Sequence, residues 1–103
     1  MTDGFRARVD SNNDEACITL EGELDLATAH ELWAAVEQAV VAKSRLVIDL
    51  SEVTFIDSSG LGVLIRVHQL LGGAGALVVR SPKPQARRLL QAAGVETLLT
   101  VEP

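Results

Sequence analysis

Two short apolar runs alternate with two segments of helical length, and this alternation most limits how the chain can fold. The runs are 46–50 and 76–79, and the helix-length segments are 58–71 and 83–93. A short β-branched run without polar alternation is typical of a strand covered on both faces. A helix between two such strands makes a parallel crossover, so the pattern predicts an α/β protein with a largely parallel sheet.

The N-terminal segment has a different pattern. Residues 5–10 alternate apolar and charged side chains, residues 11–14 favour a turn, and a second apolar-rich strand begins at Cys17. This pattern predicts an antiparallel hairpin. With an edge strand within 96–101, the expected order is β β α β α β α β, a mixed sheet with an N-terminal antiparallel hairpin and helices packed on it.

The first helix is expected over 28–42, because apolar residues recur there at helical spacing. Asp25 or Thr28 is its expected cap. The glycines of 72–75 predict a C-cap and a turn after the second helix. The third helix is expected to begin near Pro84 and to end at Gly94.

Length and charge limit the classes of function. The 103 residues fit one domain, and the net charge of −5 argues against nucleic acid or an anionic membrane as a partner. Residues 1–57 hold twelve acidic and four basic side chains, and residues 58–103 hold two and five. The acidic half favours a partner with a basic patch. No apolar run opens the chain, so a cytoplasmic protein is expected.

Metal and cofactor chemistry is not expected. A single cysteine, Cys17, together with His30 and His68 makes a poor set of metal ligands, and Cys17 is interpreted as a small buried residue. The glycines of 60–62 and 72–75 match neither a dinucleotide fingerprint nor a P-loop.

The segment from Ile56 to Val63 joins a predicted strand to the second helix and carries the candidate site. Asp57 or Ser58 is expected to cap that helix, which stabilises it by about 1 kcal/mol. Gly60 and Gly62 follow in the first turns, where each costs on the order of 1 kcal/mol relative to alanine. Something is therefore expected to approach this backbone closely.

The second helix is apolar over roughly 220° of its circumference, about twice the stripe needed to face a sheet. If Leu70 and its apolar neighbours face the sheet, Leu61 and Ile65 lie at the margin beside Ser58. Two interpretations stay open: these residues form a docking surface, or a neighbouring helix covers them.

Ser58 is a poor candidate for a catalytic nucleophile, because His68 lies about 15 Å away along the same helix. Covalently attached phosphate is more plausible. A serine at a helix N-terminus lies beside backbone amides that favour an anion. A phosphate there adds about −1.5 to −2 charges to an apolar contact surface, which is expected to expel a docked partner.

Three sequence blocks resemble the anti-sigma factor antagonists, small bacterial proteins built on the STAS domain. The blocks are 22–25, 46–51 and 55–64, and the similarity extends through 86–90 and Gly94, nearly to the end of the chain. The resemblance implies a single STAS domain over 1–103. The chain stops at Pro103, which leaves little for the additional terminal helix of many relatives.

The resemblance also implies a role in partner switching. The unmodified form would bind an anti-sigma factor, a serine/threonine kinase of the histidine-kinase-like ATPase class, and so free a sigma factor. That partner would use ATP and magnesium to phosphorylate Ser58, and a serine phosphatase would reverse the step. The chain would then be a substrate and not an enzyme.

The residues expected to bind the partner surround Ser58. They are Asp25, Asp57, Ser59, Gly60, Leu61, Gly62 and Ile65. For Asp25 and Asp57, hydrogen bonding and capping within their loops is the competing interpretation. The alternative function that the resemblance allows is an accessory subunit of an ABC-type lipid transporter.

Overall fold

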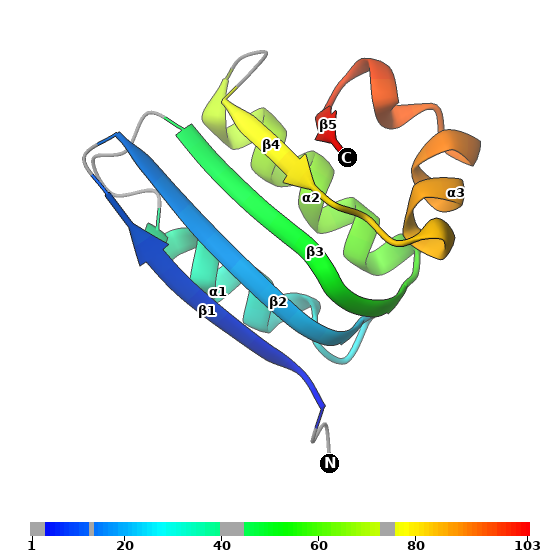
Figure 1. Cartoon of the computed structure of the whole chain (residues 1–103), viewed down its shortest axis with the longest axis horizontal. Helices are drawn as coiled ribbons and strands as arrows, with labels where there is room; N and C mark the ends of the chain where they lie inside the picture. The colour runs from blue at the N-terminus through cyan, green and yellow to red at the C-terminus, as the bar shows by residue number, and fades with distance from the viewer. Residues whose placement is uncertain (1–3, 13, 40–44, 73–75) are drawn as a thin grey trace.

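The computed structural model describes residues 4–12, 14–39, 45–72 and 76–103. Its elements follow the expected order (Figure 1). They are β1 (Arg6–Ser11), β2 (Glu15–Leu24), α1 (Ala29–Ala39), β3 (Arg45–Ile56), α2 (Ser58–Leu71), β4 (Leu77–Arg80), α3 (Pro84–Ala92), the 3-10 helix η1 (Val95–Thr97) and β5 (Thr100–Glu102).

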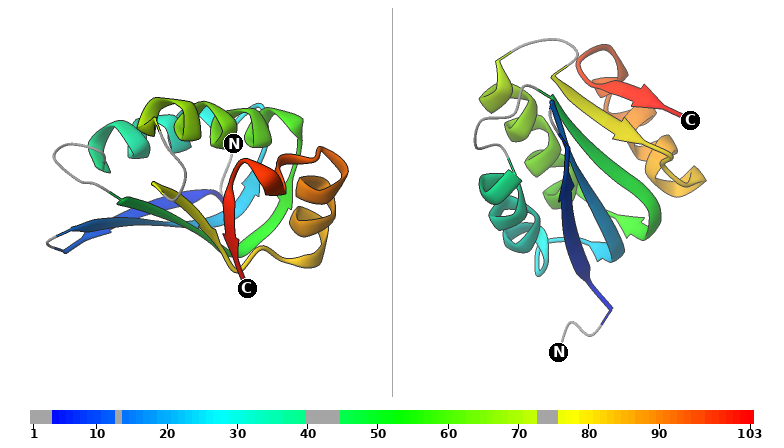
Figure 2. Two further views of the ribbon diagram at one scale, coloured as in Figure 1. Left: turned by 90° about the horizontal axis from the view of Figure 1, so that it is seen from above. Right: turned by 60° about the vertical axis from the view of Figure 1, so that its left-hand side comes forward.

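The five strands form one sheet in the order β1-β2-β3-β4-β5. β1 pairs with β2 antiparallel, and every later neighbouring pair is parallel. Both α1 and α2 lie against one face of the sheet, and α3 packs near the end of β3 (Figure 2). The predicted α/β class, mixed sheet and N-terminal hairpin are confirmed.

The opposite face of the sheet carries no helix in the part of the chain that the structure describes (Figure 2). The expectation that the strand around Val47 is covered on both faces therefore needs a correction. Val47 and Val78 lie on the open face and are still buried. Arg45 and Arg80 each pair with Glu102 there, at 3.5 and 3.1 Å. The apolar stems of such side chains shield the valines from water.

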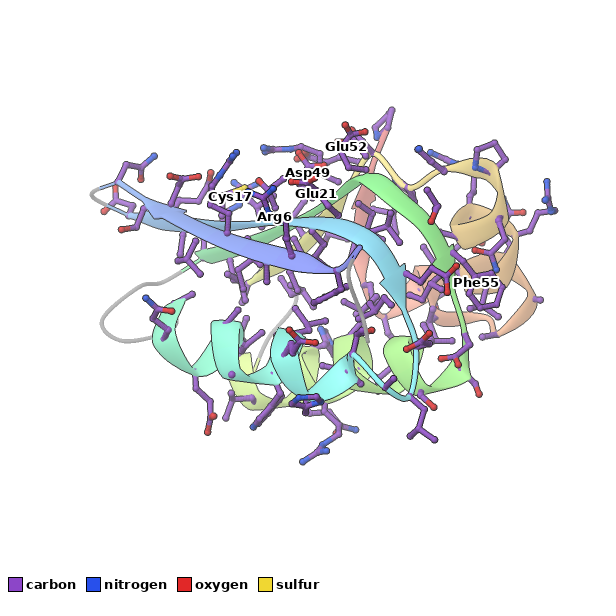
Figure 3. All side chains as sticks on the ribbon, turned by 90° about the horizontal axis from the view of Figure 1, so that it is seen from below. Arg6, Cys17, Glu21, Asp49, Glu52 and Phe55 are labelled. Carbon is purple, nitrogen blue, oxygen red and sulfur yellow. The ribbon has the colours of Figure 1, made fainter. Side chains whose placement is uncertain are left out.

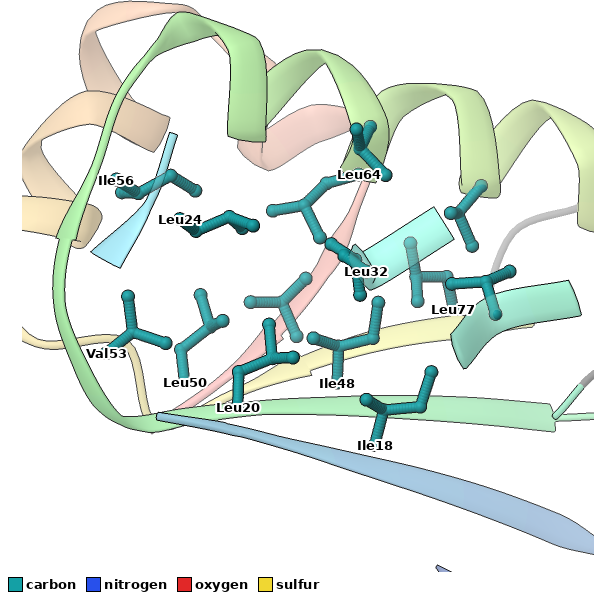
Figure 4. Packing of buried hydrophobic residues seen from close by; sticks show 14 of the residues in the cluster. Ile18, Leu20, Leu24, Leu32, Ile48, Leu50, Val53, Ile56, Leu64 and Leu77 are labelled. Atoms are coloured by element: carbon teal, nitrogen blue, oxygen red, sulfur yellow. The ribbon is translucent and has the colours of Figure 1, made fainter. Parts of the chain in front are cut away.

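The core lies between the sheet and the helices. Leu24, Ile56 and Leu64 pack together below the start of α2, where β2 and β3 end side by side (Figure 4). Val9 of β1 and Trp33 of α1 are partly buried against this cluster. Because Leu24 and Ile56 pack against Leu64, the ends of β2 and β3 are held at a fixed place relative to the first turn of α2.

The helix boundaries agree with the sequence expectations where the structure describes them. Pro84 is the first residue of α3, and Gly94 follows that helix with a φ of 70°. Gly72 caps α2 in the left-handed conformation with a φ of 75°. Residues 40–42 of the first predicted helix and residues 73–75 of the predicted turn lie outside the described residues.

The rotation of α2 about its own axis differs from the one expected from the sequence. Leu61 is only 6% exposed and belongs to the core, whereas Leu70 is 54% exposed. Ile65 is partly buried against the core. Val63, Leu64 and Val67 are buried as expected, so the buried sector is only rotated toward Leu61 and away from Leu70. The apolar arc of α2 is wider than the face that the sheet covers, and periodicity alone did not fix which part of the arc is buried.

Substitution of Leu61 tests this orientation. We expect Leu61→Ala to lower the free energy of unfolding by about 2–5 kcal/mol, because it leaves a cavity in the core. Leu70→Ala, the same change on the exposed side of α2, is expected to alter it by less than about 0.5 kcal/mol. Urea denaturation of both variants measures the difference, and equal stabilities would contradict the burial of Leu61.

Candidate functional site at the start of α2

The carboxylate of Asp57 caps α2. Its Oδ1 accepts hydrogen bonds from the backbone amides of Ser59 and Gly60, at 2.8 and 3.1 Å. Ser58 is thus the first helical residue and not the cap, and its side chain is exposed. The capping carboxylate already occupies the two amides that were expected to favour a phosphate, so an anion on Ser58 would lie beside it and point toward solvent.

A second cap shapes the turn between β2 and α1. Asp25 Oδ1 accepts hydrogen bonds from the amides of Ala27 and Thr28, at 3.0 and 3.2 Å. The buried Thr28 hydroxyl donates to the carbonyl of Glu23 at 2.7 Å and accepts from the amide of Asp25 at 3.0 Å. The two alternatives for the cap of the first helix therefore act together, and the side chain of Asp25 has a structural role.

The two loops touch each other directly. The amide of Asp57 donates to the carbonyl of Leu24 at 3.2 Å. A Cβ atom added to Gly60 would lie 2.7 Å from the Leu24 oxygen and 2.7 Å from its Cγ. Gly60 is buried, so the close approach expected at this glycine comes from Leu24 of the same chain.

Gly62 differs from Gly60. It is half-exposed, and a Cβ atom there would meet nothing within 4 Å. Ser58, Gly62 and Ile65 are separated by four and three residues, so they share one side of α2. Ser58 is exposed and Ile65 half-buried. The missing side chain of Gly62 leaves the helix backbone open between them.

Sequence reasoning missed the large apolar side chain that is most exposed among the described residues. Leu26 is 78% exposed and lies in the turn after Leu24, whose carbonyl is bonded to Asp57. Phe55, at the end of β3, is 42% exposed (Figure 3). An apolar side chain directly after the capping Asp25 was the available signal, because turn residues are usually polar. Of the two interpretations left open for Leu61, the structure shows burial, and the exposed apolar side chain is Leu26 in the neighbouring loop.

The remaining candidate residues are accounted for in place. Ser59 is half-buried, and its amide is bound to Asp57. Cys17, interpreted from the sequence as a small buried residue, is only half-buried and lies on the open face of the sheet with Asp49 (Figure 3). Its partial burial raises the pKa of the thiol. A raised pKa disfavours the reactive thiolate.

The described residues hold no cluster of His, Cys, Asp or Glu fit for a metal ion. Within them, too, no helix is long and apolar enough to cross a membrane.

Comparison with known proteins identifies the family. The family model described as "Mlab, STAS domain" matches residues 7–100, so the chain belongs to the STAS domain family. A STAS-domain containing protein of Pseudomonas aeruginosa is 27% identical, over 88% of this chain and 91% of the relative.

Within this family, the anti-sigma factor antagonists are among the similar proteins. RsfB, an anti-sigma-F factor antagonist of Mycobacterium tuberculosis, is 32% identical over 91% of this chain and 78% of its own length. The crystal structure of an anti-sigma factor antagonist from Mycobacterium paratuberculosis matches with a TM-score of 0.88 and 30% identity, over 100% of this chain and 89% of that one. The resemblance drawn from the three sequence blocks is confirmed.

The two glycines of α2 provide a matched test of the site's geometry. We expect Gly60→Ala to lower the free energy of unfolding by about 1–3 kcal/mol, because the new methyl group overlaps Leu24. Gly62→Ala is expected to raise it by up to about 1 kcal/mol, because alanine is the better helix former and has open space. Urea denaturation measures both values, and a change of the same sign in both would contradict this geometry.

Proposed function

We propose that the chain is an anti-sigma factor antagonist whose contact with its partner is switched off by phosphorylation of Ser58. The observation that carries the proposal is the exposed Ser58 hydroxyl at the first position of α2, fixed by the cap of Asp57. The partner is an anti-sigma factor, a serine kinase of the histidine-kinase-like ATPase class. The unphosphorylated chain binds it and frees the sigma factor in the cytoplasm.

The phosphoryl transfer uses groups of both proteins. The Ser58 oxygen attacks the γ-phosphorus of ATP that the kinase holds with magnesium, and the bond to the β,γ-bridging oxygen breaks to release ADP. A base of the kinase takes the hydroxyl proton. This chain contributes the positioned hydroxyl, and a separate serine phosphatase hydrolyses the phosphate ester.

Charge and solvation supply the switch. The phosphate adds about −1.5 to −2 charges beside the carboxylate of Asp57. Because Asp57 already accepts from the amides of Ser59 and Gly60, the fold offers these donors to the phosphate only if Asp57 releases them. The hydrated anion therefore stays on the surface that meets the partner, where its desolvation would weaken binding.

The docking surface of this proposal combines two loops. Leu26 stands as the apolar contact, and the open backbone at Gly62 lets the partner come close to α2. The carboxylates of Asp25 and Asp57 lie in the same two loops, so the surface suits a partner with basic side chains. Ile65 borders this surface. The buried Leu61 supports α2 from below and is not proposed as a contact.

Incubation with the candidate kinase and ATP, followed by mass spectrometry, tests the site of phosphorylation. We expect one phosphate on Ser58 and no labelling of Ser58→Ala. Ser58→Asp is expected to weaken binding of the kinase by about tenfold or more, since each 1.4 kcal/mol changes the dissociation constant tenfold. Labelling of Ser59 alone would refute the assignment. Capture of a transport ATPase in place of the kinase would support the accessory subunit of a lipid transporter.

The apolar contact is tested by a second pair of variants. Leu26→Ala is expected to weaken binding of the unphosphorylated chain to the kinase by about tenfold, because a leucine buried at an interface contributes roughly 1.5 kcal/mol or more. Leu70→Ala removes another exposed leucine, about 18 Å from Ser58 along α2, and is expected to leave the dissociation constant unchanged. Isothermal titration calorimetry measures both, and equal affinities would place the contact elsewhere.

A further inference from the structure

The side-chain amide of Gln85 holds the backbone of Ile56 with two hydrogen bonds. Its Oε1 accepts from the Ile56 amide at 3.0 Å, and its Nε2 donates to the Ile56 carbonyl at 2.9 Å. The two residues are 29 positions apart, on α3 and β3. Ile56 is 1% exposed, so its backbone groups need partners within the protein.

The sheet itself does not supply those partners. β4 pairs with β3 only as far as the pair Asp49 and Arg80, and β3 continues to Ile56 beyond that point. On the side of β2, the amide of the next residue, Asp57, donates to Leu24. The Gln85 amide therefore takes the place of a neighbouring strand on the side of β4, with one donor and one acceptor as a peptide unit has.

This clamp lies directly before the site. Ile56 is followed by the capping Asp57 and then by Ser58, and Figure 1 shows α3 beside the turn from β3 into α2. The turn is thus held from both sides, by Leu24 of β2 and by Gln85 of α3. Loss of the hydrogen bonds to Leu24 or to Gln85 would free the backbone on either side of the Ile56–Asp57 bond, and so loosen the position of the Ser58 hydroxyl.

We propose that Gln85 is a positioning residue for phosphoryl transfer to Ser58. Its amide fixes the Ile56 peptide, and through it the direction in which Ser58 meets the kinase. The inference rests on the proposed function. Gln85 is expected to affect the rate of phosphoryl transfer more than the affinity for the kinase. Its side chain is hydrogen-bonded to Ile56, whereas the proposed docking surface is built around Leu26 and Gly62.

The variant Gln85→Glu tests the clamp through its pH profile. An ionised carboxylate accepts from the Ile56 amide but repels the Ile56 carbonyl, whereas a protonated carboxyl donates to that carbonyl. The pKa of the introduced carboxyl is therefore expected to be raised above its ordinary value. The folded state then favours the protonated form, so the clamp is present at low pH and lost as the pH rises through the raised pKa.

We expect the labelling rate of Gln85→Glu, relative to that of the original chain at the same pH, to be about tenfold lower at pH 8 and to recover as the pH falls toward about 5.5. The dissociation constant of the kinase is expected to change by less than about twofold. The control is Gln91→Glu, which places the same charge on the exposed side of α3 and should label at the original rate at every pH.

Amide hydrogen exchange provides a readout that does not use the kinase. In Gln85→Glu at pH 8, the amides of Ser59 and Gly60 are expected to exchange faster, whereas those of β1 keep their protection. Equal labelling of both variants, or a slow rate that does not recover at low pH, would overturn the role of Gln85 and leave the proposed function intact. Failure of the original chain to be labelled would overturn the proposed function and this inference with it.

Discussion

The ends of β2 and β3 meet the first turn of α2 at one point, and the candidate site depends on that contact. Leu24 accepts a hydrogen bond from Asp57 and lies so close to Gly60 that only glycine fits there. Asp57 in turn binds the amides of Ser59 and Gly60. One backbone carbonyl, one glycine and one carboxylate thus set where the hydroxyl of Ser58 stands, and the serine side chain itself is exposed.

The molecule separates its structural contacts from the surface proposed for its partner. The open face of the sheet is covered by ion pairs around Arg45, Arg80 and Glu102, whose stems shield two valines. Exposed ion pairs of this kind add little to stability, so their packing matters more than their charge. At the other surface, the exposed Leu26 follows Asp25 in the loop that is hydrogen-bonded to Asp57, the residue before Ser58. The phosphate proposed for Ser58 would change the charge of that second surface only, because the ion pairs of the first lie on the open face of the sheet.

Much of the fold was predictable from local patterns. The antiparallel hairpin, the parallel crossovers, the start of α3 at Pro84 and the left-handed Gly94 that follows α3 agree with the structure, because periodicity, proline and glycine act within a few residues. The rotation of α2 was not predictable, because its apolar arc allows more than one buried side. Leu70 was placed on the side that faces the sheet and is 54% exposed, whereas Leu61 was placed at the margin, with exposure or coverage left open, and is buried.

For the site, the sequence by itself determined that a serine with an acidic neighbour and two glycines opens a helix. Only the tertiary structure decided what each of them does. It assigned Gly60 to Leu24, left Gly62 open, exposed Leu26 and brought Gln85 to a peptide 29 residues away. The physical reason is the distance along the sequence over which each feature is set. A helix cap or a helical period depends on residues within one turn. Close approach, burial and the hydrogen bonds of Gln85 to a distant backbone depend on which segments the packed core brings together.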